Sequence, residues 1–393
     1  MKAGGRSLRT ITLVAAMAVV VLGAGAGAYA QQEHGGRFIV AFQPDVRAGV
    51  QRALIEGWGV TPIKVLPLIN AWAVRADPMA VTMMRAQDRV LRVDTDLLIE
   101  AFAEGDKPEE VHPAPGYQPP QTVPWGIERV RAPEAWASSE GAGVKVGIVD
   151  TGIDLNHPDL RANIAGNASF VLGAPSGEDD NGHGTHVAGT VAAVNNEIGV
   201  VGVAPRAKLY AVKVLSRTGQ GWLSDIIDGL TWCVNNRIQV VNMSLGCAEG
   251  NESFHAAIQA VHGAGIIMVA AAGNDGQGRV SYPAAYDEEV IAVSATDSDN
   301  RLASFSNYGW EIDFAAPGVG INSTYFRWRY RELSGTSMAS PHVAGVCALR
   351  LAAHRRESPA EVEAALAGAA EDLGAAGPDP NFGNGLINAL GAL

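Results

Sequence analysis

The chain has 393 residues, enough for two or three domains, and it is rich in glycine. Its formal net charge of -12 at pH 7 argues against a nucleic-acid partner, although it does not define a substrate. The three cysteines, Cys233, Cys247 and Cys347, are an odd number, so at least one is unpaired in a monomer. Their apolar or small neighbours favour buried free thiols over a disulfide framework.

The first thirty residues have the composition of an export signal. Basic residues come first, an apolar run follows at 11–22, and Ala28-Tyr29-Ala30 is a small-residue cleavage sequence. We expect residues 1–30 to be removed after Ala30 and the protein to be secreted. An uncleaved anchor is the alternative, but the run is short for a bilayer span. No later segment is long and apolar enough to cross a membrane, so we expect no stable membrane association after cleavage.

Residues 31–102 are predicted to form a small domain of their own. Apolar spacing indicates two helices among several short strands. The expected elements are a strand at 37–42, a helix at 45–58, two strands within 61–76 broken at Pro67, a helix at 78–90 and a strand at 91–102. The order βαββαβ is that of a ferredoxin-like α+β domain.

Residues 103–120 contain five prolines and four acidic residues and are predicted to be an exposed linker. Residues 121–393 alternate apolar strands with helices, which implies an α/β domain with a mostly parallel sheet and helices on both faces. The expected strands are 144–149, 208–214, 238–243, 266–272 and 290–295, and the expected helices are 183–194, 223–236, 253–264, 337–353 and 359–370. Sites in such sheets lie beyond the carboxyl ends of the strands. Asp150 and Asn274 each follow a strand and are expected there.

The stretch 334–345 predicts a helix that opens at Thr336 or Ser337, with Pro341 early in it. Ser337 would then lie near the positive end of the helix dipole. Its hydroxyl could attack a carbonyl carbon while its own N–H holds the resulting oxyanion. The alternative for this serine is a simple N-cap on a core helix.

Two further stretches supply partners for Ser337. Residues 144–154 form an apolar strand with Asp150 at its carboxyl end, and residues 181–190 form a turn that leads His183 into a small-residue helix. The chain order acid, base, nucleophile is the order found in subtilisin. The segment 270–274 ends in Asn274, whose amide could donate a hydrogen bond to an oxyanion.

Taken together, these four motifs resemble the subtilisin-like serine proteases of the subtilase family, from about Gln121 to Leu393 and more weakly over the N-terminal domain. The resemblance implies that Ser337 is the nucleophile, that His183 is the general base and that Asp150 orients the imidazole. It implies that Asn274 and the Ser337 N–H hold the oxyanion. The expected activity is that of an endopeptidase acting through a Ser337 ester.

The resemblance also assigns a role to the N-terminal domain. In such relatives a propeptide of this shape guides folding, inhibits the enzyme as an intramolecular partner and is then cut off. The tail 93–102 resembles the end that lies in the active site, so we expect autocleavage after Phe102, with Tyr117 as a second candidate. The mature protein is expected to be a monomer that acts on polypeptide substrates.

The resemblance further implies a substrate groove and a calcium site. The groove would favour large apolar residues before the scissile bond, and three further apolar residues would line an outer pocket. The expected groove residues are Gly219, Gln220, Gly221, Ser244, Leu245, Gly246, Ala271, Ala272 and Gly273, and the outer-pocket residues are Leu215, Leu223 and Ile226.

The expected Ca²⁺ ligands are Gln121, Asp159, Val194, Asn196, Ile198 and Val200, an all-oxygen set that suits this ion. A second, weaker cation site is possible at Ala284, Tyr286, Glu311 and Asp313, although a residue is inserted between Tyr286 and Val290.

Some features leave other interpretations open. Asp150-Thr151-Gly152 is also the aspartic-protease signature, but that chemistry needs a second carboxylate motif. The pair His183-x-x-His186 could bind a metal, although packing is the simpler role for His186, as it is for His342. A cysteine at 247, where the family usually has glycine, and a short loop at 274–282 leave fine specificity open.

Two rival functions make different demands on the sequence. A non-catalytic binding relative would lack one of the catalytic residues, and none is missing from the sequence. A dedicated processing protease would need an acid-lined pocket for basic residues, for which Asp275 near the rim is the one candidate.

Overall fold

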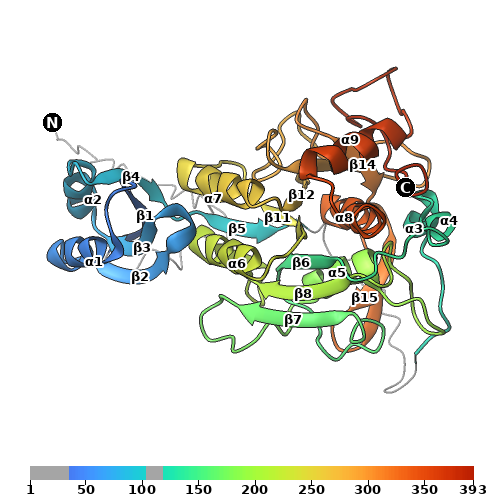
Figure 1. The fold of residues 1–393 in the computed structure, drawn as a ribbon, viewed down its shortest axis with the longest axis horizontal. Helices are drawn as coiled ribbons and strands as arrows, with labels where there is room; N and C mark the ends of the chain where they lie inside the picture. The colour runs from blue at the N-terminus through green and yellow to red at the C-terminus, as the bar shows by residue number, and fades with distance from the viewer. Residues whose placement is uncertain (1–34, 103–117) are drawn as a thin grey trace, which may run out of the picture.

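The computed structural model describes residues 35–102 and 118–393. The N-terminal domain, residues 35–95, carries two helices on one face of a four-stranded antiparallel sheet with the order β2-β3-β1-β4 (Figure 1). Its elements are β1 (Gly36–Phe42), α1 (Ala48–Gly57), β2 (Thr61–Leu66), the 3₁₀ turn η2 (Pro67–Ile69), β3 (Ala71–Ala76), α2 (Pro78–Arg85) and β4 (Val90–Thr95). This is the ferredoxin-like arrangement expected from the sequence.

The expected strand at 91–102 is wrong, because it is two strands in two different sheets. β4 ends at Thr95, and β5 (Leu98–Ala101) pairs with β9 (Gln220–Trp222) and β11 (Leu245–Gly246) of the larger domain. The break falls at Asp96, a buried carboxylate that accepts hydrogen bonds from the backbone N–H and the hydroxyl of Ser224. Asp96 also pairs with Arg37 at 2.8 Å. The chain turns there because this carboxylate is held by another domain.

The larger domain is built on a seven-stranded sheet in which every pair of neighbours is parallel. The five strands expected from the sequence lie side by side in its interior, and the two edge strands were missed. In sheet order the strands are β14 (Phe314–Pro317), β13 (Ile291–Thr296), β12 (Ile267–Ala271), β10 (Val240–Met243), β6 (Lys145–Asp150), β8 (Lys208–Lys213) and β7 (Ile164–Ser169). This confirms the predicted α/β class.

Helices cover both faces of this sheet. Val187 of α5 (His183–Ala192) and Val343 of α8 (Thr336–Ala353) pack in one hydrophobic cluster with Ile148 of β6. Leu230 of α6 (Leu223–Asn235) and Phe254 of α7 (Glu252–Gly263) pack in a second cluster on the other face. Three further helices, α3 (Trp125–Arg129), α4 (Ala132–Ala135) and α9 (Pro359–Ala369), lie on the α8 side, as does the hairpin of β15 (Ile321–Tyr325) and β16 (Arg329–Leu333).

The N-terminal domain rests on α6 and α7. The open face of its sheet contributes Ile39 and Ala73 to the same hydrophobic cluster as these two helices. Asp94 accepts hydrogen bonds from the N–H and the hydroxyl of Ser253 at the start of α7, as Asp96 does at the start of α6. Two carboxylates of one domain therefore satisfy N–H groups at the first turns of two helices of the other, where negative charge is favourable.

Several predictions concern residues that the structure does not describe. The export signal, its cleavage after Ala30 and the cleavage candidate Tyr117 all lie outside the described ranges. Within those ranges, no helix has the length and apolar character needed to span a bilayer.

Candidate active site

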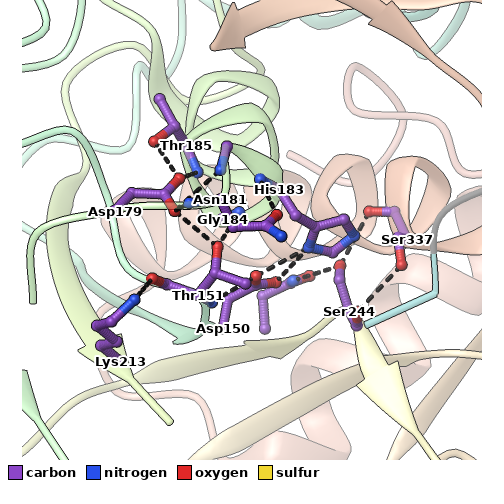
Figure 2. Close-up of polar contacts among 12 residues, drawn as sticks. Asp150, Thr151, Asp179, Asn181, His183, Gly184, Thr185, Lys213, Ser244 and Ser337 are labelled. Carbon is purple, nitrogen blue, oxygen red and sulfur yellow. Dashed lines mark hydrogen bonds and ion pairs between the residues drawn. The ribbon is translucent and has the colours of Figure 1, made fainter. Parts of the chain in front are cut away.

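His183 and Asp150 meet at the carboxyl edge of the sheet. Asp150 is the last residue of β6, and His183 is the first residue of α5. The Nδ1 atom of His183 lies 2.8 Å and 3.0 Å from the two carboxylate oxygens of Asp150 (Figure 2). Burial disfavours a charged imidazole, but the charge and hydrogen bonding of Asp150 outweigh it and raise the pKa of His183 above its ordinary value.

Ser337 lies on the other side of the same imidazole (Figure 2). It is the second residue of α8, after a helix start at Thr336 that the sequence predicted. Its hydroxyl donates a 3.0 Å hydrogen bond to the Ser244 carbonyl oxygen, so it is not an N-cap. The Nε2 atom of His183 is buried and has no hydrogen-bond partner among the described residues. A buried nitrogen left open beside a hydroxyl can accept that hydroxyl's proton.

Asn274 presents its amide nitrogen near the start of α8. β12 ends at Ala271, one residue before the end of the expected strand 266–272, and a turn at Gly273 with φ of 105° separates it from Asn274. The Asn274 Oδ1 atom accepts hydrogen bonds from the N–H and the hydroxyl of Thr336, which leaves Nδ2 buried and without a partner in the described ranges. This fixes the amide with its donor side open, as an oxyanion donor requires.

The predicted groove residues surround β5, which is the middle strand of the sheet β11-β5-β9. Leu245 and Gly246 pair with one edge of β5, and Gln220 and Gly221 pair with the other. Beyond the paired residues, the Ala101 N–H donates to the Gly219 carbonyl at 2.9 Å, and the Phe102 N–H donates to the Ser244 carbonyl at 3.3 Å. The tail of the N-terminal domain is thus a peptide bound by strand addition, and its Phe102 N–H shares the Ser244 carbonyl oxygen with the Ser337 hydroxyl.

Side chains of this bound segment fill two apolar positions. The Phe102 ring lies against Gly246, where an added Cβ would come within 2.6 Å of it. Ile99 is fully buried in the cluster that contains Leu215, Leu223 and Ile226, the residues predicted to line the outer pocket. Ala271 and Ala272 are buried as well.

Cys247 stands next to Gly246 and is half-buried, unlike the buried Cys233 and Cys347. All three are free thiols, but the predicted burial holds only for Cys233 and Cys347. The Cys247 thiol donates to the Glu249 carbonyl at 3.1 Å, and burial raises its pKa to about 11. A thiol with so high a pKa is a poor nucleophile at neutral pH.

Sequence analysis missed a second buried carboxylate behind the first. Asp179 accepts hydrogen bonds from the hydroxyls of Thr151 and Thr185 and from three backbone N–H groups. The Thr151 hydroxyl in turn accepts from the Gly184 N–H at 2.9 Å (Figure 2). This network joins the residue after Asp150 to the residue after His183. It therefore fixes the two ends of the Asp150–His183 contact.

Lys213 is the other residue of this region that the sequence did not indicate. Its side chain is buried, and its ammonium donates to the Thr151 carbonyl and, at 2.6 Å, to Asp180. Lysine is rarely buried unless it is paired. The signal in the sequence was a single lysine inside the run 209–215, whose other residues are apolar or aromatic.

The two other histidines of interest are packed. His186 contacts the carbonyl oxygens of Ile321 and Arg331 through Nε2 at 2.9 Å each, and burial lowers its pKa to about 3. His342 donates from Nδ1 to the Met338 carbonyl within its own helix, and burial lowers its pKa to about 4. Neutral imidazoles in these roles fit the packing interpretation.

The six predicted calcium ligands come together from three segments. Asp159 accepts hydrogen bonds from the Asn196 amide and the Val200 N–H, at 2.8 Å and 2.9 Å. The Gln121 side-chain oxygen accepts from the Asn196 N–H, and the Val194 N–H donates to the Asp159 carbonyl. Ile198 bridges to Pro120 beside Gln121. Burial raises the pKa of Asp159 to about 6, against the lowering effect of its hydrogen bonds from Val200 and Asn196.

Comparisons with known proteins agree with this geometry. The sequence model of the subtilase family matches residues 141–385. The thermostable alkaline protease of Halalkalibacterium halodurans is 49% identical over 271 residues, which are 68% of this chain and 73% of that protein. Subtilisin Savinase of Lederbergia lenta is 50% identical over 273 residues, 69% of this chain and 99% of that protein. Subtilisin DY of Bacillus licheniformis is 48% identical over 273 residues, 68% of this chain and 97% of that protein.

The fold, the site and these matches define a hydrolase of peptide bonds, and the chain belongs to the subtilase family. More particularly, it is a subtilisin-type serine endopeptidase.

Proposed function

We propose that Ser337, His183 and Asp150 are the catalytic residues, in the roles of nucleophile, general base and orienting carboxylate. Nε2 of His183 and Nδ2 of Asn274, two of the four buried side-chain nitrogens that have no partner among the described residues, support this assignment. Both would gain partners during acyl transfer, one from the serine proton and one from the oxyanion. A buried donor or acceptor without a partner is costly, so a pair of them beside one serine calls for a functional explanation.

The reaction would proceed in two halves. His183 takes the hydroxyl proton as the Ser337 oxygen attacks the scissile carbonyl, and the N–H groups of Ser337 and Asn274 hold the oxyanion. The imidazolium then gives its proton to the leaving amine, and an ester remains on Ser337. Water hydrolyses this ester by the same route with His183 again as base. Asp150 stays ionised and stabilises the imidazolium.

The observation that carries this proposal is the position of β5. A segment of the chain lies in a groove between β9 and β11 and brings the Phe102 N–H to the Ser244 carbonyl oxygen, which also accepts the Ser337 hydroxyl. Residues 98–102 therefore serve as a template for a substrate bound through its main chain, with Phe102 before the scissile bond. The pockets occupied by Phe102 and Ile99 favour large apolar residues at these two positions. The nine groove residues named from the sequence would act as the substrate-binding residues.

Residues 31–102 would then be a propeptide that inhibits the enzyme until the bond after Phe102 is cut. Removal of an export signal after Ala30 and secretion complete the proposed maturation, and residues 121–393 form the peptidase domain. A single chain carries both inhibitor and enzyme, so no partner subunit is needed and we propose a monomer.

The experiment that tests this function labels the nucleophile. Matured protein is treated with phenylmethylsulfonyl fluoride, assayed on a peptide nitroanilide that ends in phenylalanine, and mapped by peptide mass spectrometry. We expect one sulfonyl adduct, on Ser337, with activity lost in proportion to labelling. Heat-denatured protein is the control and should stay unlabelled, because a free serine hydroxyl is a weak nucleophile. An adduct on another residue, or full activity after Ser337 is labelled, would refute the assignment.

We also propose that Gln121, Asp159, Val194, Asn196, Ile198 and Val200 bind Ca²⁺. The donor set fits this ion, because it combines one buried carboxylate with amide and carbonyl oxygens. The raised pKa of Asp159 fits as well, since a cation would compensate a charge that burial disfavours. Bound calcium would stabilise the loop 194–200 and would take no part in the chemistry. The second cation site, near Asp313, stays a prediction.

Calcium removal should lower thermal stability. A ligand present at about a thousand times its Kd stabilises the native state by about 4 kcal/mol. For a domain of this size that amounts to a Tm difference of about 10 °C. The measurement is thermal unfolding of the Ser337→Ala protein, which cannot digest itself, in millimolar calcium and in chelator. Asn196→Ala should remove most of the difference, and equal Tm values in calcium and chelator would contradict the site.

A further inference from the structure

The hairpin formed by β15 and β16 places three arginines near the catalytic histidine. Residues 326–333 contain Arg327, Arg329 and Arg331 and a single acidic residue, in a chain whose net charge is -12. Such a concentration of positive charge on an acidic protein is a local feature that overall charge does not explain. Nothing in the catalytic mechanism uses these side chains.

The hairpin is anchored directly to the start of α5. The Ser323 hydroxyl donates to the His186 carbonyl, and the Thr324 hydroxyl donates to the Thr185 carbonyl, at 2.8 Å each. The Tyr325 hydroxyl donates to the Asn181 carbonyl at 3.3 Å. Gly182, the residue before His183, packs so closely under the Tyr325 and Phe326 rings that an added Cβ would clash with both. The hairpin thus forms the wall of the active site beside His183.

Aromatic rings hold two of the arginines in place. The Arg331 guanidinium lies 5.2 Å from the Tyr325 ring centre and donates to the Tyr325 hydroxyl at 3.2 Å. The Arg327 guanidinium lies 5.0 Å from the Phe326 ring centre, at the exposed turn. Stacking on aromatic faces orients guanidinium groups and lowers the entropy cost of further contacts with carboxylates.

The bound segment shows which side of the scissile bond this wall faces. Residues 98–102 run along the groove as far as the Ser244 carbonyl oxygen, which accepts from both the Phe102 N–H and the Ser337 hydroxyl. On the proposed function, the residues after Phe102 therefore belong to the leaving side of a substrate. The next described residue of the chain is Gln118, and it lies on the hairpin. Its side chain donates to the Trp328 carbonyl at 3.4 Å and accepts from the Tyr330 hydroxyl at 2.8 Å. The chain therefore leaves the active site at Ser337 and is next found against the hairpin.

The sequence between these two points complements the hairpin in charge. Residues 103–117 contain four acidic residues, Glu104, Asp106, Glu109 and Glu110, and one lysine. We propose that Arg327 and Arg331 form a subsite for acidic residues on the leaving side of the scissile bond, and that this chain's own residues 103–117 are its first occupant. The enzyme would accordingly prefer polypeptides in which a large apolar residue is followed, two to four residues later, by aspartate or glutamate. This inference rests on the proposed catalytic function and names the substrate class for the same site.

Two quenched fluorescent peptides test the proposal. One has the sequence of residues 99–106 of this chain, and the other differs only in Glu104→Gln and Asp106→Asn. For the matured wild type we expect kcat/KM about tenfold higher on the acidic peptide at low salt, since charge-assisted contacts are stronger than neutral ones. In about 0.5 M salt the ratio should fall towards one, because the Debye length becomes shorter than the contact region. Equal values on the two peptides at low salt would overturn the proposal.

Variants assign the effect to the two arginines. In the double variant Arg327→Gln/Arg331→Gln, the ratio of kcat/KM on the acidic peptide to kcat/KM on the neutral peptide should fall to within about twofold of one. This loss is in the range expected for two surface ion pairs. Arg206→Gln, which removes one charge from an exposed arginine paired with Glu140, is the matched control and should keep the wild-type ratio. An unchanged ratio in the double variant would refute the subsite. Cleavage of the neutral peptide reports that each variant is folded and active, and failure of the wild type to cleave either peptide would instead refute the proposed function and the inference with it.

Discussion

Ser337→Ala is expected to stop both self-processing and peptide hydrolysis. The loss in kcat should be about 10⁶, a figure that comes from subtilisin itself and that we adopt rather than derive. The reason is the geometry at the start of α8, where this hydroxyl lies beside the imidazole of His183, whose Nε2 has no partner among the described residues, and contacts the Ser244 carbonyl oxygen that also accepts from Phe102. Residual hydrolysis would come from oxyanion stabilisation and binding.

The measurement follows residues 31–393, produced with calcium, by intact mass. Wild type should shorten at the bond after Phe102, whereas Ser337→Ala should stay at full length. Ser334→Ala, three residues earlier, is the matched control and should be processed normally. A trace of matured wild type added to the Ser337→Ala precursor should cut it, which would show that the bond is accessible. Self-processing of the Ser337→Ala protein at the wild-type rate would remove Ser337 from the mechanism.

Asp150→Asn should lower kcat by about 10⁴, the size of the effect in serine proteases generally. The amide can donate as well as accept, so it no longer requires His183 to carry its proton on Nδ1. With the proton on Nε2 instead, the imidazole cannot accept the Ser337 proton. The measurement is kcat on a peptide nitroanilide, and a loss of less than tenfold would contradict the orienting role.

The same variant should change the pH profile. The free enzyme needs neutral His183, so kcat/KM should rise with pH through the pKa of His183. That midpoint should lie above about 6.5, the ordinary value for histidine, because the Asp150 charge raises it against burial. Propeptide removal exposes the ring to water and so relieves burial, which does not lower the midpoint. In Asp150→Asn the midpoint should move to lower pH, although Asp179 still contributes in the raising direction. An unmoved midpoint would show that another group controls the profile.

The interior of the fold could be predicted from the sequence because its signals are local. Buried parallel strands are continuous apolar runs, such as residues 266–270, and the helices between them have regular apolar spacing. The edge strands β7 and β14 were missed for the same reason. Their sequences, IAGNAS and FAAP, carry glycine, asparagine or proline in place of apolar β-branched residues. Their pairing depends on neighbours far away in the sequence.

The break at Asp96 could not be predicted, because its cause is contact with another domain. The sequence of residues 91–102 carries no signal that the Asp96 carboxylate accepts hydrogen bonds from Ser224 at the start of α6. The four motifs of the candidate site were found because each carries its chemistry in a few adjacent residues. Asp179 and Lys213 were not found, because a buried charge is recognisable only once its partners are assembled around it.

The position of β5 as a middle strand has a kinetic consequence. On the proposed function, inhibitor and enzyme are one molecule while the bond after Phe102 is intact, and the groove meets residues 98–102 at an effective concentration that dilution cannot change. Once that bond is cut, residues 31–102 are held by non-covalent affinity alone, and their rebinding becomes a second-order reaction. The lag before free activity should then depend on how dilute the protein is. A concentrated solution of cleaved but still inhibited molecules would therefore become active on dilution alone.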